Sequence, residues 1–338
     1  MKALAPHFAA LLVATLLAFS IWSKGDKPAD SDAKKVEVWG GTAERVERIR
    51  FESPKRTVSL EAKSDSVGRY YLATVDKEEV KPRSPHGAPP DADAGAAEEP
   101  PKRTSTRFVG VKEANELAAK LAPLTALREI GPLGSGRAEE FGFDKPEGTL
   151  KVKVGGTEQV LVIGGATPGG QERYAKREPG GTVYAVSGDL VQSLLGAESR
   201  LLERDFHGFE DADVTRLRIG RSGKSREVVS MSEKKGAWAD AAQPSKLDET
   251  VGNWLAKVKR LSVAEYVEKP PAALTPESAV VRIEYFGGMK TLGYLELYKL
   301  PAEKGSDFYV KTENSRWFVK VLASAGEQVE QDLPSVVK

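Results

Sequence analysis

The stretch GGATPGGQE at residues 164–172 has the glycine content of a phosphate-binding loop. Such a loop needs Gly, four residues, Gly, Lys and then Ser or Thr, because the ammonium group reaches the phosphates and the hydroxyl holds magnesium. Counted from Gly165, the Lys position is Gln171 and the hydroxyl position is Glu172. The following residues also read as a strand and not as a helix whose N-terminus could bind an anion. We therefore expect a hairpin turn here and no nucleotide binding.

Histidines could supply acid-base or metal chemistry, but the chain has only His7, His86 and His207. They fall in an apolar N-terminal segment, in a proline-rich segment and at the junction between the two halves of the chain. Positions so different do not predict convergence on a metal ion or in a catalytic triad. We expect no metal site and no histidine-based catalysis.

Carboxylates gather at residues 139–144, in the run EEFGFD. Glu139, Glu140 and Asp144 could in principle form a catalytic acid pair. Acidic residues beside a turn are more often solvated surface groups. The Gly142 turn between two phenylalanines, followed by Asp144-Lys145-Pro146, predicts a structural corner, because proline restricts the residue before it to extended geometry.

Arginines recur at alternate positions in two similar segments. VERIRF at 46–51 matches VTRLRI at 214–219, so that Arg48 and Arg50 correspond to Arg216 and Arg218. Alternation of arginine with apolar residues is typical of a strand with one exposed basic face. A recognition role for this face is one interpretation, and a solvated surface is the other.

Composition excludes several classes of function. The chain has 338 residues, 40% of them hydrophobic, which is enough for two or three ordinary domains. Its formal net charge of +1 predicts no overall field that would attract nucleic acid. It contains no cysteine, which excludes disulfides, thiolate metal sites and a cysteine nucleophile. We expect no cofactor.

The N-terminus reads as a targeting segment. Lys2 precedes an apolar run that continues to Trp22 and then turns polar at Lys24. The small residues Ala18 and Ser20 would permit cleavage as a signal peptide, whereas Trp22 suits the interfacial position of a retained anchor. Both readings stay open, and we expect a signal anchor at residues 1–24, with the bulk of the chain on the periplasmic side of the cell membrane.

The sequence also contains an internal repeat. Residues 114–130 match residues 251–267 without gaps, and both carry the i, i+3, i+4, i+7 apolar stripe of an amphipathic helix. Alternating segments follow in both halves, LKVKV at 150–154 and VRIEY at 281–285. The offset between the halves falls from 168 to 137 residues, so the first half carries an insertion. We place it at 76–107, a region rich in proline and charge that we expect to be disordered.

These patterns predict an α+β fold. We expect two tandem, structurally similar units at 38–198 and 205–334, each a mostly antiparallel β-sheet packed by one main amphipathic helix, after an N-terminal transmembrane helix.

A set of these motifs resembles the domain of unknown function 4340 family (DUF4340). It comprises ALREIG, EEFGFDKP, VLVIGGATPGG, RYAK and TVYAVSGDLVQSLL, and it covers about residues 68–240. The corner departs from the family pattern only at Phe143, where leucine is usual. The resemblance implies a single N-terminal membrane segment and an association with ABC transporter components, including gliding-motility-type subunits. It implies no catalytic residues.

Two hypotheses of function follow. We favour a noncatalytic, membrane-anchored envelope protein that acts as a scaffold or binds protein partners, such as an ABC-type transporter or a surface assembly, because antiparallel sheets offer exposed faces and edges for docking. The alternative is an envelope hydrolase that uses carboxylates in a cleft between the two units.

Overall fold

The computed structural model describes residues 35–78, 103–231 and 236–338. In these residues the chain forms two large antiparallel sheets and one small sheet, with few helices, which confirms the α+β class. None of the helices in these ranges is long and apolar enough to cross a membrane. The anchor predicted at 1–24 lies outside the described residues.

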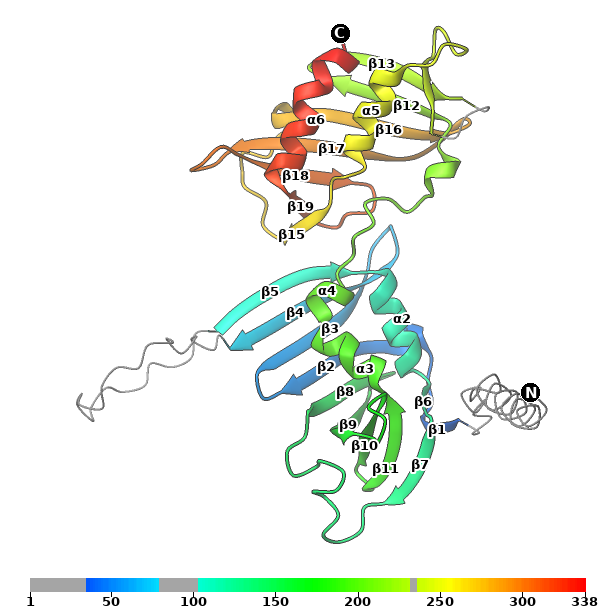
Figure 1. The fold of residues 1–338 in the computed structure, drawn as a ribbon, viewed down its shortest axis with the longest axis vertical. Coiled ribbons are helices and arrows are strands. Elements are labelled where there is room, and N and C mark those ends of the chain that lie inside the picture. The colour runs from blue at the N-terminus through cyan, green and yellow to red at the C-terminus, as the bar shows by residue number, and fades with distance from the viewer. Residues whose placement is uncertain (1–34, 79–102, 232–235) are drawn as a thin grey trace, which may run out of the picture.

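The first sheet has nine strands in the order β5-β4-β3-β2-β8-β9-β10-β11-β7 (Figure 1). It consists of two meanders, β2 to β5 and β8 to β11, which join where β2 pairs with β8. The strand bounds are β2 Val46–Ser53, β3 Arg56–Ser64, β4 Arg69–Glu78, β5 Arg103–Gly110, β7 Arg128–Pro132, β8 Gly148–Val154, β9 Thr157–Ala166, β10 Glu172–Glu178 and β11 Thr182–Ser187. Beside this sheet, β1 (Val36–Trp39) pairs with β6 (Leu124–Ala126).

Strands β4 and β5 correct the boundaries of the predicted insertion at 76–107. Asp76 lies opposite Ser105, and Glu78 lies opposite Arg103, so both ends of that range belong to the sheet. The prediction relied on the lack of apolar residues, but main-chain hydrogen bonds hold an edge strand without them, and threonine favours strands. Residues 79–102 lie outside the described residues.

The second sheet has eight strands in the order β14-β13-β12-β16-β17-β18-β19-β15. Read from its second strand, the first sheet has the corresponding order β4-β3-β2-β8-β9-β10-β11-β7, with β5 as an additional edge strand. The bounds in the second sheet are β12 Arg216–Arg221, β13 Lys224–Ser230, β14 Trp238–Asp240, β15 Val263–Val267, β16 Ala279–Gly287, β17 Lys290–Pro301, β18 Ser306–Thr312 and β19 Phe318–Val321.

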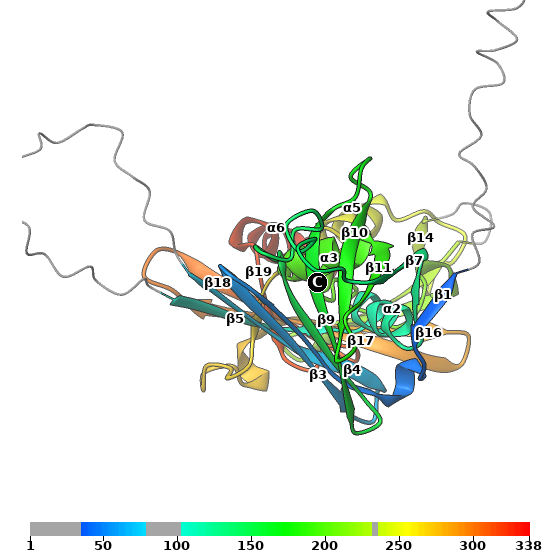
Figure 2. The ribbon, with the colours of Figure 1, turned by 90° about the horizontal axis from the view of Figure 1, so that it is seen from below.

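Helices cover one face of each sheet. α2 (Lys112–Leu121), α3 (Gly188–Leu195) and α4 (Ala197–Arg200) lie on the first sheet, and α5 (Glu249–Val258) and α6 (Ala323–Val336) lie on the second. Figure 2 shows the helices of both sheets on the same side of the molecule. The other, outer faces of the two sheets are therefore available for contacts with solvent or partners.

The two helices predicted to share an apolar stripe, α2 and α5, bury it as expected. The buried residues of α2 are Ala114, Leu117, Ala118 and Leu121, and those of α5 are Val251, Trp254, Leu255 and Val258. Full burial of one large apolar side chain stabilises a fold by about 1.5–3 kcal/mol. The indole Nε1 of Trp254 also donates a hydrogen bond of 2.9 Å to the Val329 carbonyl of α6, so α5 and α6 are fixed to each other as well as to the sheet.

Asp248 caps the N-terminus of α5. Its Oδ1 accepts a hydrogen bond of 3.0 Å from the Val251 amide, and its Oδ2 pairs with Arg226 at 2.6 Å. Burial acts to raise the pKa of Asp248, but the Val251 amide and the Arg226 guanidinium outweigh it and hold the pKa below its ordinary value. Ser245 and Asp248 have the spacing of a capping box. The helix begins three residues later than that pattern requires, because Asp248 itself is the capping residue.

Side chains also connect the two sheets. Arg316, which precedes β19, is 6% exposed in its side chain; its Nε lies 3.2 Å from Oδ2 of Asp65, and its guanidinium lies 5.0 Å from the Tyr70 ring centroid. Arg107 of β5 forms an ion pair with Glu268, which follows β15. The edge strands β5 and β15 lie next to each other at this junction. Each sheet therefore shields one edge of the other from pairing with another chain.

A candidate binding face on the first sheet

Four basic side chains project from the outer face where β2 and β8 pair. Arg48 lies directly opposite Lys153, and Arg50 directly opposite Lys151. The alternation of both strands determines this arrangement, because their intervening residues (Ile49, Phe51, Leu150 and Val152) are buried on the helical side of the sheet. We call these four residues the basic quartet.

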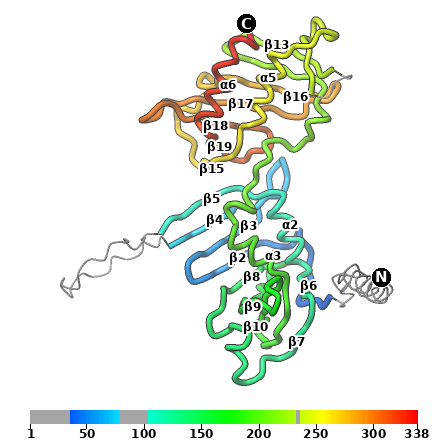
Figure 3. The backbone as a smooth tube through the Cα atoms, viewed as in Figure 1, coloured from blue at the N-terminus to red at the C-terminus, as the bar shows by residue number. Residues whose placement is uncertain are grey.

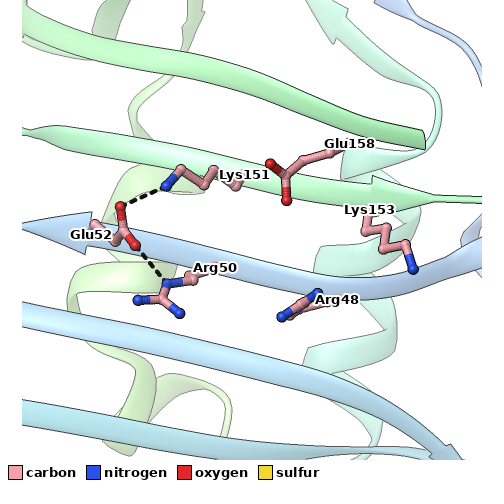
Figure 4. Close-up of a pocket in the computed structure, with 6 residues that line it drawn as sticks. All are labelled: Arg48, Arg50, Glu52, Lys151, Lys153 and Glu158. Carbon is pink, nitrogen blue, oxygen red and sulfur yellow. Dashed lines mark hydrogen bonds and ion pairs between the residues drawn. The ribbon is translucent and has the colours of Figure 1, made fainter. Parts of the chain in front are cut away.

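Two carboxylates complete the shallow depression that contains the quartet (Figure 4). The depression encloses about 290 Å³ and is lined by the quartet, Glu52 and Glu158. Glu52 accepts Arg50 Nε at 2.6 Å and Lys151 Nζ at 3.0 Å. The hydrogen bond from Lys151 is the main reason that the pKa of Glu52 lies below its ordinary value. One carboxylate thus serves two cations.

The other half of the quartet has fewer partners. Lys153 Nζ lies 2.7 Å from Oε2 of Glu47, at the edge of the depression. Arg48 lies opposite Glu61 of β3 but makes no ion pair with it or with any other residue that the structure describes. Glu158 of β9 lies opposite Lys153 and makes no ion pair with the described residues either. Four cations against two carboxylates leave the lining of the depression with excess positive charge.

The corresponding arginines of the second sheet have a different environment. Arg218 lies opposite Glu227 on β13 and Glu284 on β16, and pairs with them at 2.8 and 3.3 Å. Arg216 pairs with Glu227 at 3.3 Å and lies 4.1 Å from the ring centroid of Phe286. At this face, opposite charges alternate across the strands and neutralise one another.

The different charge pairing on the two outer faces affects the stability of each sheet. Opposite charges on facing residues of neighbouring strands stabilise a sheet, and like charges destabilise it, by roughly 0.2–1 kcal/mol per pair. The first sheet contains two such like-charged pairs side by side. Guanidinium and ammonium groups in this arrangement are donors for carboxylate or phosphate oxygens, so an anionic ligand would relieve the repulsion. The arrangement is therefore chemically suited to binding an anion.

The sequence alone predicts only half of this face. Arg48 and Arg50 and the alternation of LKVKV at 150–154 are visible in it, but no local pattern places the two segments side by side. The pairing of β2 with β8 is non-local, since Glu52 and Lys151 are 99 residues apart. The available signal was that both segments alternate cationic and apolar residues, and that no acidic residue separates the cations in either one.

The predicted corner at EEFGFDKP is a structural element. The Gly165 amide at the end of β9 donates a hydrogen bond of 2.8 Å to the Phe141 carbonyl, and the Phe141 ring lies 4.8 Å from that of Tyr174. Gly142 has a φ of +72°, and a Cβ there would lie 2.6 Å from the Gly165 amide nitrogen. The backbone approach thus requires glycine.

The carboxylates beside the corner are exposed and do not converge. Glu140 pairs with Arg137 at 2.7 Å, and this hydrogen bond is the main cause that lowers the pKa of Glu140. Glu139 and Asp144 are exposed. The glycine stretch at 164–172 forms the predicted hairpin, in which Gly169 and Gly170 have positive φ between β9 and β10.

His207 lies in the connector between the sheets, residues 201–215, whose course Figure 3 shows between α4 and β12. Its Nδ1 lies 3.1 Å from Glu313, and its ring stacks on Phe209. His7 and His86 lie outside the described residues. Within the described ranges no group of three acidic or histidine side chains is placed to hold a metal ion.

A groove of about 780 Å³ runs beside this connector and contains several carboxylates. Two of them, Glu203 and Asp211, have local partners. Glu203 accepts hydrogen bonds from the backbone amides of Lys112, Arg204 and Asp205, so that it binds the N-terminus of α2. Asp211 pairs with Lys259 at 2.7 Å. These contacts fix the connector between the two sheets.

Comparison with known proteins identifies a family. Residues 112–279 match the family model described as Domain of unknown function (DUF4340). Over this stretch the chain thus matches DUF4340, as the motifs predicted, although the match begins later and ends later than the expected range of 68–240. It covers α2 to the 3-10 turn before β16, including the corner and the connector. Neither curated proteins nor solved structures gave a significant match.

Proposed function

We propose that this chain is a noncatalytic envelope protein that works by binding partner proteins, and that the basic quartet of the first sheet is its principal contact. The observation that carries the proposal is the pairing of like charges, Arg48 with Lys153 and Arg50 with Lys151, across two adjacent strands. Such pairs oppose folding. These like-charged pairs do not stabilise the fold, but they can bind an anionic surface of a partner protein.

We further infer that the two units are tandem copies that have diverged on their outer faces. The corresponding strand orders and the matched helices α2 and α5 support this inference. One face carries excess positive charge, and the other is neutralised by Glu227 and Glu284. A scaffold with one binding unit and one supporting unit follows from this difference.

The location and the class of partner rest on sequence. The apolar run before Trp22 supports a single-pass membrane anchor with the sheets on the periplasmic side. The family resemblance supports ABC transporter components or a surface assembly as partners. Alkaline carbonate extraction tests the anchor, and a full-length chain in the soluble fraction would contradict it.

Co-purification tests the binding role. The chain would be isolated from detergent-solubilised membranes as wild type, as Arg48→Gln and as Arg216→Gln, and bound proteins would be identified by mass spectrometry. Arg216 is the matched control, because it occupies the corresponding position on β12. We expect Arg48→Gln to lose a protein that wild type and Arg216→Gln both retain. Identical sets of bound proteins in all three samples would refute the proposal.

The alternative, an envelope hydrolase, has one observation in its favour. The connector groove holds carboxylates together with His207 and would admit a small substrate. Against it, Glu203 and Asp211 already bind the backbone or a lysine. A screen with chromogenic esters, phosphates and glycosides tests this reading. Turnover that is lost in both Asp205→Asn and His207→Gln would favour the enzyme.

A further inference from the structure

We propose that the basic quartet binds an extended acidic segment of a partner protein, with carboxylates at alternate residues. This inference rests on the proposed function and specifies its ligand. The outer face of the β2–β8 pair is a flat array in which the cations form two rows of two, one row on each strand. A ligand that uses all four must present its negative charges at the spacing of these rows.

The spacing of the rows matches that of an extended peptide. Arg48 and Arg50 are two residues apart on one strand, which places their Cα atoms roughly 7 Å apart. Side chains at alternate residues of any extended chain have the same separation and project to the same side. The second row, Lys151 and Lys153, lies on the neighbouring strand roughly 5 Å away. Each carboxylate of such a peptide would therefore lie between one arginine and one lysine.

The ion pairs of the quartet can be broken or shifted to admit a ligand with little loss of stability. The side chains of Arg50, Lys151 and Lys153 are 45%, 34% and 35% exposed, and exposed ion pairs contribute little to stability. Arg48 needs no rearrangement, because it makes no ion pair with the described residues, including Glu61 opposite it on β3. Arg50 can keep Glu52 as a partner and still donate to a ligand, since a guanidinium has five N–H donors.

A polar peptide fits this face better than a lipid surface does. Among the described residues, the exposed large apolar side chains lie away from β2 and β8, at Val67, Ile130, Leu247, Met289 and Leu322. Lipid binding usually combines cations with apolar side chains that enter the interface. On the neighbouring strand β3, the small polar Ser59 lies opposite Arg50 and leaves room for a peptide backbone, and Glu61 lies opposite Arg48 at the edge of the face.

Fluorescence anisotropy would test the ligand directly. The 338-residue chain, purified in a nonionic detergent, would be titrated into a labelled peptide with glutamates at alternate positions separated by serines. An isomeric peptide with its glutamates side by side has the same net charge but cannot present them all on one face. We expect the alternating peptide to bind more tightly, and raised salt to weaken both.

Variants then assign the binding to the quartet. We expect Arg48→Gln and Lys153→Gln each to weaken binding of the alternating peptide about fivefold, the effect of about one exposed charge pair. Arg48→Lys should largely restore the affinity, and Arg216→Gln should leave it unchanged. Thermal unfolding of each variant verifies folding, and Arg48→Gln removes no ion pair with the described residues.

Three outcomes would overturn the inference: equal affinity for the two isomers, no effect of Arg48→Gln and Lys153→Gln, or binding only to vesicles containing phosphatidylglycerol. Comparison with co-purification separates this inference from the proposed function. If Arg48→Gln loses its co-purified protein but the peptide does not bind, the partner-binding role stands and the acidic segment is wrong. If the peptide binds but Arg48→Gln keeps all of its co-purified proteins, the quartet binds acidic segments and its role as the principal partner contact is wrong.

Discussion

Adjacent glycines at the end of β9 should respond to alanine in opposite ways. A Cβ on Gly164 would lie 2.3 Å from the Phe141 carbonyl oxygen and 2.9 Å from Cε1 of Phe143. The carbonyl cannot move freely, because it accepts the 2.8 Å hydrogen bond from Gly165. Overpacking typically costs about 1–3 kcal/mol and a weakened hydrogen bond about 1 kcal/mol. Against this, replacing glycine in a strand returns about 0.5–1 kcal/mol. We expect Gly164→Ala to lower stability by about 2 kcal/mol.

Gly165→Ala is the matched control. Its Cβ would meet only Phe141 O at 3.7 Å and Gly142 Cα at 3.8 Å, which are ordinary contacts. We expect it to be neutral or slightly stabilising, whereas Gly164→Ala should lower the melting temperature of the first sheet by about 4–8 °C. Differential scanning calorimetry would resolve the two sheets if they unfold separately. Equal melting temperatures for the two variants would refute the reasoning that the corner is docked on Gly164.

Three further predictions concern charged side chains. In urea unfolding, Arg48→Gln should raise the free energy of unfolding by about 0.2–1 kcal/mol and Arg218→Gln should lower it by a similar amount. Arg48 lies opposite Lys153 and makes no ion pair with Glu61, its other neighbour, whereas Arg218 pairs with carboxylates on both neighbouring strands. The ionised Asp248 carboxylate should contribute its full stabilisation above its ordinary pKa of 3.8, and this contribution should disappear as the pH falls through the lower pKa of the folded state. Asp248→Asn has no such carboxylate, so its stability should lack this pH dependence. Arg316→Ala should cost about 1–2 kcal/mol and move the calorimetric transitions of the two sheets apart.

Each of these predictions has a contradicting result. Loss of stability in Arg48→Gln would show that its neighbours do not repel it. Identical acid unfolding curves for wild type and Asp248→Asn would show that the ion pair with Arg226 does not make the stability of the fold depend on pH. Unchanged calorimetric transitions in Arg316→Ala would show that the contact with Asp65 and Tyr70 does not couple the sheets.

The sequence predicted those parts of the fold that depend on local periodicity. The apolar stripes of α2 and α5 and the hairpin at Gly169 follow from spacing and from glycine, and the structure confirms them. Residues 76–78 and 103–107 were assigned wrongly, because edge strands can form without apolar residues. The basic quartet required knowledge of which strand lies beside β2, and this depends on tertiary pairing that no local pattern records. Arg316 was missed for the same reason.

The join between the meanders also has a consequence for folding. In each sheet the meanders form from neighbouring hairpins, but the β2–β8 and β12–β16 ladders must close long loops, which is entropically costly and slow. We expect these two ladders to be the last to form. At β12–β16 the crossing charges attract, through Arg218 and Glu284, whereas at β2–β8 they repel. The first sheet should therefore close later and open more readily along this line. Amide hydrogen exchange should be faster there, and an anion bound across both strands should slow it by holding the two meanders together.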